Sequence, residues 1–491
     1  MRKLICLLLL LVFKVGSSQT AYIKQYTSDK AEMPISIVQM NNFNLIALCI
    51  SNEMLGYTQS SRVIKTNNKG DTEAEFNYEI QGNSFYNITT LVPVNDTEFI
   101  TIARIKSEEL PFGQIGVIKF DTLLNVIWEK KFAMNKPIVD NVFVAKNLTG
   151  NIIIGAGLYT QLSPSDLSLV FMEISSNGDS LQARYLIDGN PNQTSIYSMM
   201  EINGHYKAFV NGYAHYVPYQ GFSEILQLDS NFNLLGVHPT PYLIEEYMTA
   251  EKVDDTRYYL TGRAYSTPTH YDVGIAKLGI AEDSIAYNHA GKPGTAVDYS
   301  GWQKCMSVAN SNSIYTGGTG NDNGIFFHCN TTNKVLMLSN YDSLLNCRWT
   351  RFYGSDTACF TMSTLEATSD GGCIMGGMIY TPSRPENLLD AVIIKVDSTG
   401  LFTGIKENEI VNIRDVNIFP NPGNQYIIIQ SGPQISGAMF YLFDANGMLV
   451  KEQILNSTQT QINTYSLLQT TYIWKIVYKG KILDTGKWIK N

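Results

Sequence analysis

Short apolar segments separated by polar turns run along nearly the whole chain, and no stretch has the 3.6-residue spacing of a long amphipathic helix. One apolar element ends in a small residue, and it returns seven times at intervals of 50 to 60 residues. This pattern predicts strands and turns that repeat as one structural unit. The seven small residues are Cys49, Ala103, Gly157, Gly212, Gly262, Gly317 and Gly377.

A second element of the repeat is an apolar strand that runs into an Asp or Asn turn, and it returns at intervals of 50 to 63 residues. The best internal match is between Phe120–Trp128 and Tyr341–Trp349. A unit of this length has room for four short strands, so the repeat predicts an all-β fold, a seven-bladed β-propeller. We expect the small residues on the strands nearest the axis, where seven backbones crowd together. An open array of β-sandwiches is the alternative, but it would not require a small residue at seven matching positions.

The last unit lacks an outer strand of its own, because the turn at Asp397–Gly400 is followed by Leu401–Ile405 and then by a polar stretch. The orphan segment Tyr22–Tyr26 has the character of the missing strand. We therefore predict that it pairs near Val392–Val396 and covers an edge that would otherwise be unpaired.

The N-terminus has the order of a secretory signal peptide: Arg2-Lys3, an apolar run from Leu4 to Phe13, and the small residues Gly16-Ser17-Ser18. The apolar run is too short to span a bilayer, and no other segment approaches 18 apolar residues, so we expect no transmembrane helix. We predict a signal peptide at 1–18, a propeller at 19–405, a linker at 406–414 and a separate domain at 415–491.

Six cysteines remain after the predicted signal peptide, and five of them lie within residues 305–373. In an exported chain this clustering favours one or two disulfides, although buried thiols are the alternative. Cys329 lies in the insertion of the longest unit, and a bridge there would tether the insertion. The sequence does not determine which cysteines pair. The candidates are Cys305, Cys329, Cys347, Cys359 and Cys373.

Charge and motifs narrow the function. The net charge is −8, and the part between residues 19 and 413 carries −14. This acidic body argues against binding nucleic acid or an anionic membrane surface. The six histidines have no metal-ligand spacing, and no nucleophile elbow, P-loop or dinucleotide fingerprint occurs. We therefore assign no catalytic residue and no resident cofactor.

Two weaker features remain open. The segment Asn321–Gly324 clusters oxygen ligands that could hold Ca²⁺, and a simple turn is the alternative. Loop tyrosines could stack on sugar rings, and packing between blades is the alternative for them. These tyrosines are Tyr213, Tyr216, Tyr219 and Tyr265.

A different pattern begins after residue 415, where alternating apolar and polar positions with regular turns predict a small immunoglobulin-like β-sandwich. Its Phe-Pro-Asn-Pro motif, the turn at Asp444–Gly447, the strand Tyr472–Val477 and the final strand closely resemble the type A C-terminal sorting domain of the type IX secretion system of Bacteroidota. The residues that carry this sorting signal are Phe419, Pro420, Asn421, Pro422, Gly447 and Lys487.

The resemblance implies Sec export followed by passage across the outer membrane, with the type IX machinery and a sortase-like peptidase as partners. It implies cleavage near residues 406–416, attachment of the cargo to lipopolysaccharide, and a secreted or outer-membrane-surface location. For the body we expect a non-enzymatic binding or adhesion module with a glycan or protein ligand. The alternatives are an extracellular hydrolase or polysaccharide lyase with its site at one propeller end, and a purely structural surface component.

Overall fold

The computed structural model describes most of the chain and divides it into two compact units, 1–405 and 406–491. The predicted signal peptide, the linker and the cleavage region lie outside the described residues, so the predicted domain boundaries stay predictions. Among the residues that are described, no helix has the length and apolar character to cross a membrane. The described ranges are 21–51, 60–78, 84–107, 110–138, 142–158, 168–186, 193–213, 221–240, 244–267, 270–293, 297–321, 334–355, 357–381, 388–401, 416–431, 437–444, 448–478 and 481–491.

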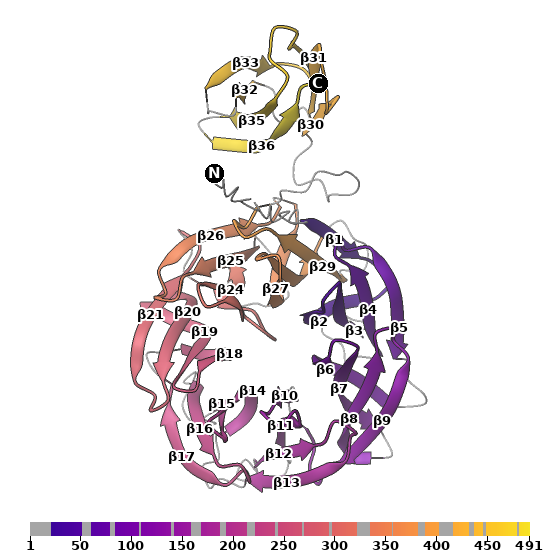
Figure 1. Ribbon diagram of the computed structural model, residues 1–491, viewed down its shortest axis with the longest axis vertical. Helices are drawn as coiled ribbons and strands as arrows, with labels where there is room; N and C mark the ends of the chain where they lie inside the picture. The colour runs from indigo at the N-terminus through magenta and orange to yellow at the C-terminus, as the bar shows by residue number, and fades with distance from the viewer. Residues whose placement is uncertain are drawn as a thin grey trace, which may run out of the picture. The chain divides into compact units, whose positions relative to one another are not determined.

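Seven antiparallel sheets form the first unit and stand around a common axis, which confirms the predicted propeller (Figure 1). Six sheets follow the chain outward from the axis, and the seventh ends on the N-terminal strand. Blades 1 to 3 are β2 (Ala31–Gln39), β3 (Phe43–Ser51), β4 (Ser60–Asn67), β5 (Thr72–Tyr78); β6 (Ser84–Asn95), β7 (Glu98–Ser107), β8 (Leu110–Asp121), β9 (Val126–Ala133); and β10 (Phe143–Lys146), β11 (Ile152–Leu158), β12 (Ser168–Ile174), β13 (Ser180–Leu186).

Blade 6 differs from the others because two short strands, β22 and β23, both pair with β24 at its inner edge. Blades 4 to 7 are β14 (Gln193–Ile202), β15 (His205–Tyr213), β16 (Gly221–Leu228), β17 (Leu234–Pro239); β18 (Ile244–Asp254), β19 (Arg257–Thr267), β20 (His270–Gly279), β21 (Ser284–Ala290); β22 (Tyr299–Ser300), β23 (Met306–Asn310), β24 (Ser313–Gly320), β25 (Val335–Tyr341), β26 (Cys347–Tyr353); and β27 (Cys359–Ala367), β28 (Cys373–Tyr380), β29 (Leu389–Val396), β1 (Tyr22–Tyr26).

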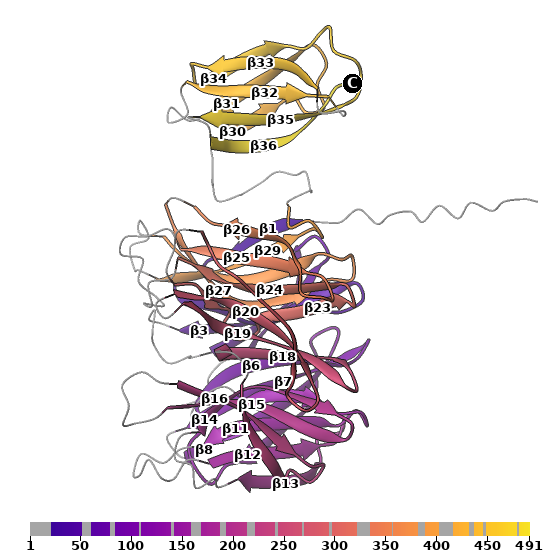
Figure 2. The same ribbon diagram turned by 90° about the vertical axis from the view of Figure 1, so that its left-hand side faces the viewer.

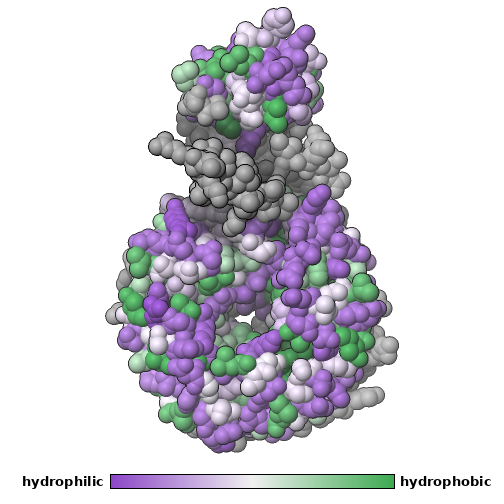
Figure 3. Space-filling view, viewed as in Figure 1, coloured by the Kyte–Doolittle hydropathy of each residue, from purple (hydrophilic) through white to green (hydrophobic). Residues whose placement is uncertain are grey.

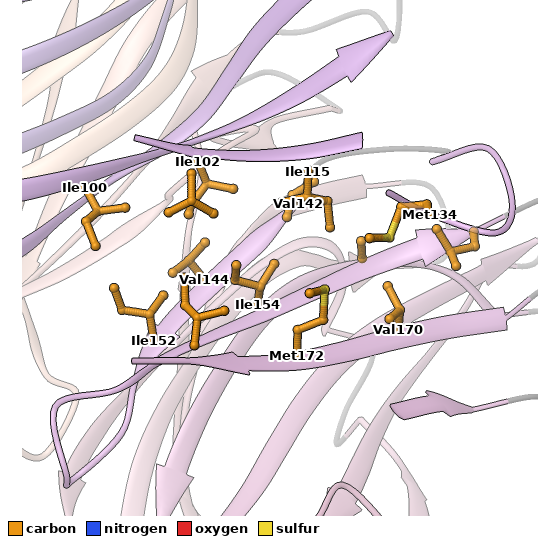
Figure 4. Close-up of a cluster of buried hydrophobic side chains, with 14 residues drawn as sticks. Ile100, Ile102, Ile115, Met134, Val142, Val144, Ile152, Ile154, Val170 and Met172 are labelled. Carbon is orange, nitrogen blue, oxygen red and sulfur yellow. The ribbon is translucent and has the colours of Figure 1, made fainter. Parts of the chain in front are cut away.

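The core of the propeller lies between blades. Successive side chains of a strand point to opposite faces of its sheet, so each blade presents apolar side chains to both neighbours. Figure 4 shows one such cluster, in which Ile102 and Ile115 of blade 2 meet Ile154 and Met172 of blade 3. All four side chains are at most 5% exposed. The centre of the ring is open in Figure 3.

The seven small residues lie on the second strand of each blade, so the prediction that they line the axis is wrong. The reason is visible at Gly377, which pairs with Met362 where the innermost strand β27 is bulged. A Cβ atom at Gly377 would lie 2.8 Å from the carbonyl oxygen of Thr361. Ala103 faces the corresponding bulge in β6, between Ile88 and Thr90. At these two positions a small residue lies beside a bulge of the inner strand, one strand away from the axis.

Hydroxyl groups on the inner strands join successive blades. Thr89 Oγ1 donates to the carbonyl of Val142 at 3.0 Å, and the amide of Ala250 donates to Ser198 Oγ at 3.0 Å. Ser363 closes the ring in the same way, because its hydroxyl donates to the carbonyl of Pro34 in blade 1. These bonds pair backbone groups of one blade with hydroxyl groups of the neighbouring blade.

The predicted closure is confirmed. Strand β1 pairs antiparallel with β29, from Tyr22 opposite Lys395 to Tyr26 opposite Ala391. The side chain of Gln25 also donates to Asp390 Oδ2 at 2.8 Å. The last blade therefore contains strands from both ends of the propeller sequence, and β1 covers its outer edge.

The predicted Asp and Asn turns join the third and fourth strands of several blades. In each, one side-chain oxygen accepts the amides two and four residues later, which is the bonding of an Asx turn. Asp121 Oδ1 accepts from Leu123 and Asn125 at 2.8 and 2.9 Å, and Asp342 repeats this at Leu344 and Asn346. The acceptor carboxylates hold the turn residues in place.

The second unit consists of two small antiparallel sheets that enclose one core (Figure 2). Phe440, Trp474 and Trp488 are among its buried side chains. The strand order is β30-β31-β34 in one sheet and β33-β32-β35-β36 in the other. The strands are β30 (Val416–Phe419), β31 (Tyr426–Ser431), β32 (Ala438–Phe443), β33 (Leu449–Leu455), β34 (Gln459–Asn463), β35 (Thr471–Tyr478) and β36 (Lys481–Ile489).

Candidate functional site

The cysteines are largely thiols, which corrects most of the predicted disulfides. Cys305, Cys347 and Cys373 carry thiols, so the prediction is wrong for these three. Cys305 and Cys373 are buried in the blades, and the sulfur of Cys305 lies 3.4 Å from Thr249 Oγ1 of the neighbouring blade. Burial raises the pKa of the Cys305 thiol to about 11. Cys359 is disulfide-bonded, and Cys329 lies outside the described residues.

The sorting-signal residues at the two ends of the second unit lie side by side. Asn421 Nδ2 donates to the carbonyl of Lys487 at 2.8 Å, and Asn421 Oδ1 accepts the amide of Ile489 at 2.9 Å. Trp488 Nε1 donates to the carbonyl of Pro420 at 2.8 Å. The motif at 419–422 and the final strand, about 66 residues apart, therefore form one structural element. Gly447 lies outside the described residues.

Sequence reasoning missed Lys490, which is more deeply placed than the predicted Lys487. Lys487 is exposed, whereas Lys490 is only 6% exposed. Its ammonium donates to the carbonyls of Asn424 at 2.6 Å and Thr464 at 2.9 Å. Burying an ammonium is costly unless it is hydrogen-bonded, so this position has a structural reason to be Lys. The alternation of Trp488, on β36, with Lys490 just after that strand was the signal available in the sequence.

The propeller offers a polar cluster at one of its two ends. We call this end the upper face; it is where each innermost strand begins and each second strand ends. In blade 5 the guanidinium of Arg263, on β19, lies there among the rings of three partly exposed tyrosines. We call these three rings the tyrosine cage. Their centres lie 4.8 Å (Tyr271), 5.3 Å (Tyr299) and 6.0 Å (Tyr265) from the guanidinium carbon.

Two carboxylates complete the surroundings of Arg263. Glu246 Oε2 lies 3.2 Å and Glu245 Oε2 lies 3.5 Å from its terminal nitrogens. Both come from an irregular part of β18, where Glu246 has a φ of 43°. Burial raises the pKa of both carboxyls, and the charge of Arg263 opposes that rise. With both carboxyls ionised, the three charged side chains sum to −1.

A histidine-aspartate pair lies at the same end of blade 5. His289 Nδ1 is 2.6 Å from Asp272 Oδ2, and the His289 side chain is 44% exposed. Tyr287, two residues earlier on β21, has its ring centre 6.1 Å from that of His289. Burial raises the pKa of Tyr287. Because Asp272 fixes one ring nitrogen, the other is held in a defined orientation.

The structure places some of the sequence candidates at this end. Tyr265 belongs to the tyrosine cage, and Tyr213 is the last residue of β15. Tyr216 and Tyr219 lie outside the described residues. The amide of Asn321 donates to Asp298 Oδ1 at 2.7 Å, while the rest of the predicted Ca²⁺ segment lies outside the description.

In the described parts of the chain, no three His, Cys, Asp or Glu side chains come together as metal ligands would. Arg263, Glu245 and Glu246 were missed by sequence reasoning. Their signal was a run of charged residues inside strands that are otherwise apolar, next to tyrosines. Nothing in the sequence alone shows that β18, β20 and β22 bring these side chains together.

Comparison with solved structures finds propellers at low identity. An ulvan lyase of polysaccharide lyase family PL25 has a TM-score of 0.49 and 10% identity, over 73% of this chain and 96% of that one. The β-propeller domain of the Trilobed protease from Pyrococcus furiosus has a TM-score of 0.42 and 11% identity, over 74% of this chain and 95% of that one. A comparison with curated proteins finds no match.

The family comparison concerns the second unit. Residues 417–491 match the model described as a secretion system C-terminal sorting domain. This range contains the Phe-Pro-Asn-Pro motif, both small sheets and the last strand. The second unit of this chain is therefore a type IX secretion sorting domain, and it follows a seven-bladed β-propeller.

Proposed function

We propose that the propeller is cargo of the type IX secretion system. We further propose that it binds a neutral glycan at its upper face without catalysing a reaction of that glycan. The observation that carries this proposal is the tyrosine cage with its carboxylates. Sugar rings are recognised by aromatic faces that cover their C–H groups and by polar groups that bond their hydroxyls. The aromatic faces would come from the tyrosine cage (Tyr265, Tyr271 and Tyr299). The polar groups would come from Glu245 and Glu246.

The charge of the site argues against an anionic polymer as the ligand. Arg263 is the cation of the cage, and two carboxylates already neutralise it. Asp272 adds a further acidic group nearby, and the body as a whole is acidic. A uronate or sulfated chain would meet repulsion here, whereas an uncharged sugar would not.

The test is binding of the purified full-length protein to an array of neutral and acidic glycans. Tyr271→Ala should weaken binding of a neutral hit about five-fold, since one lost aromatic contact of this kind costs on the order of 1 kcal/mol. Tyr185→Ala is the matched control, because Tyr185 is a 37% exposed tyrosine on the rim strand β13. Equal loss in both variants, or binding to acidic glycans alone, would contradict the proposal.

The export route is the second part of the proposal. Residues 1–18 direct Sec export, and a sortase-like peptidase cuts near residues 406–416 and leaves the propeller on the surface or in the medium. The family match of residues 417–491 supports this route. Mass spectrometry of surface protein should find a mature chain that starts near residue 19 and ends before Phe419. Full-length protein held in the periplasm would contradict it.

One observation favours a second candidate, an extracellular hydrolase or polysaccharide lyase. An imidazole anchored by Asp272, with a phenol beside it, is an arrangement that can take and give protons. Turnover of any polysaccharide that is lost in His289→Ala, with binding retained, would favour this candidate over the first.

A further inference from the structure

Seven hydrogen bonds join residues 420–424 to residues 487–491, and the four made by Asn421 and Gly423 have the pattern of a strand added to a sheet. Among the described strands, β36 forms a ladder only with β35, so its other side is the edge of the sheet. The Asn421 side chain covers the carbonyl of Lys487 and the amide of Ile489. Gly423 continues the pattern, because its amide donates to the carbonyl of Ile489 and its carbonyl accepts from Asn491, each at 2.8 Å.

The sequence of the motif explains why this pairing suits Pro-Asn-Pro-Gly. Asn421 and Gly423 are the two positions that bond to β36, and the prolines at 420 and 422 have no amide hydrogen to leave unpaired. The side-chain amide of Asn421 replaces a peptide group, since it offers one donor and one acceptor. The motif is therefore a short substitute strand for the edge of β36.

Two further residues fix this contact. A Cβ atom at Gly423 would lie 2.6 Å from the carbonyl oxygen of Pro420 and 2.9 Å from Trp488 Nε1, so only glycine fits. Lys490 ties the C-terminal end of the contact to Asn424 and Thr464 through its buried ammonium. We call the contact between residues 420–424 and 487–491 the clasp.

We infer that the clasp makes the sorting signal a single folded surface, in which Asn421 and Lys490 are positioning residues and Lys487 is presented outward. A protein component of the secretion machinery then reads the closed clasp rather than two separate sequence motifs. The inference rests on the sorting role of residues 417–491. It assigns the Asn421 side chain a role that depends on both of its polar atoms.

The test expresses the full chain in a Bacteroidota host with type IX secretion and measures the fraction that reaches the surface or medium. Asn421→Asp keeps the size and the acceptor for Ile489 but replaces the donor with an acceptor facing the carbonyl of Lys487. We expect it to lower export about ten-fold, as Gly423→Ala should, because each opens one end of the clasp. Asn463→Ala is the matched control: it removes a side-chain bond to the amide of Tyr465 elsewhere in the domain.

Thermal unfolding and proteolysis of retained protein separate recognition from folding. Loss of export in Asn421→Asp with an unchanged unfolding temperature and normal export of Asn463→Ala would support the inference. Normal export of Asn421→Asp and Gly423→Ala would overturn it. If Asn421→Asp and Gly423→Ala are both unfolded, an equal loss of export in Asn463→Ala would also overturn the inference. Normal export after deletion of residues 415–491 would instead refute the sorting role itself.

Discussion

At the scale of single residues, Glu282 joins blades 4 and 5 through a buried ion pair. Lys207 and Glu282 are 5% and 7% exposed, and the carboxylate also accepts from Tyr258 and from Gln227. Burial, followed by the charge of Glu282, raises the pKa of Tyr258, so the phenol stays a donor. The carboxylate is thus the shared acceptor of two blades.

Removing the charge of Glu282 should destabilise the propeller. Glu282→Gln leaves the ammonium of Lys207 buried without its ion-pair partner, which costs about 3 kcal/mol. Urea unfolding of the full chain measures this loss. Asp255→Asn, at an exposed ion pair with Lys252, is the control and should change the free energy of unfolding by less than about 1 kcal/mol. Equal effects of the two substitutions would contradict the expected role of Glu282.

The disulfide of Cys359 allows a second prediction at this scale. Four other cysteines, Cys49, Cys305, Cys347 and Cys373, carry thiols, and Cys6 belongs to the predicted signal peptide. We therefore expect Cys359 to be linked to Cys329, in the insertion of blade 6. Peptide mapping without reduction should recover the two peptides joined, and alkylation before reduction should label Cys347 because it is exposed. A joined peptide that contains Cys305 or Cys373 would contradict this pairing.

At the scale of strands, closure of the ring depends on the five residues of β1, Tyr22–Tyr26. Ile23 of β1 packs against the core between blades 6 and 7. Ile23→Asp places a charge in that core and should cost about 2–3 kcal/mol, seen as a lower unfolding temperature and faster proteolysis within blade 7. Ile127→Asp is the control, since Ile127 is 47% exposed on the rim strand β9. No difference between the two variants would show that β1 is dispensable.

Blade 7 also gives a pH dependence. Burial raises the pKa of Asp370, but bonds from Thr368 and from the ammonium of Lys395 at 2.9 Å outweigh it, and the net pKa is lowered. A carboxyl whose pKa is depressed on folding stabilises the protein above its unfolded pKa, near 3.9, and loses this contribution as pH falls through the folded value. Asp370→Asn should therefore lose less stability than the wild type between about pH 5 and pH 2. If the free energy of unfolding of Asp370→Asn and of the wild type changed in parallel with pH, this role of Asp370 would be excluded.

The sequence predicted the strand repeat well because its determinants are local. Asp121 and Asp342 make the same turn with neighbours two and four residues away, so their spacing alone reveals them. The small-residue repeat was recognised but placed one strand too far inward, since the bulge that demands Gly377 lies on a different strand. The upper-face cluster was missed for the same reason: Arg263 and Tyr299 are 36 residues apart and meet only when blades pack.

At the scale of the molecule, the acidic body and the proposed neutral ligand make a joint prediction about salt. The net charge of −8 creates a negative potential that screening by salt reduces over about 10 Å at 0.1 M. A neutral glycan does not interact with this potential, so its dissociation constant should change less than about two-fold between 50 and 500 mM NaCl. An anionic polymer would bind more tightly as salt screens the repulsion, and a cationic one more weakly. Calorimetric titration at several salt concentrations therefore identifies the charge class of the ligand independently of its chemical identity, and a strong salt dependence in either direction would overturn the neutral assignment.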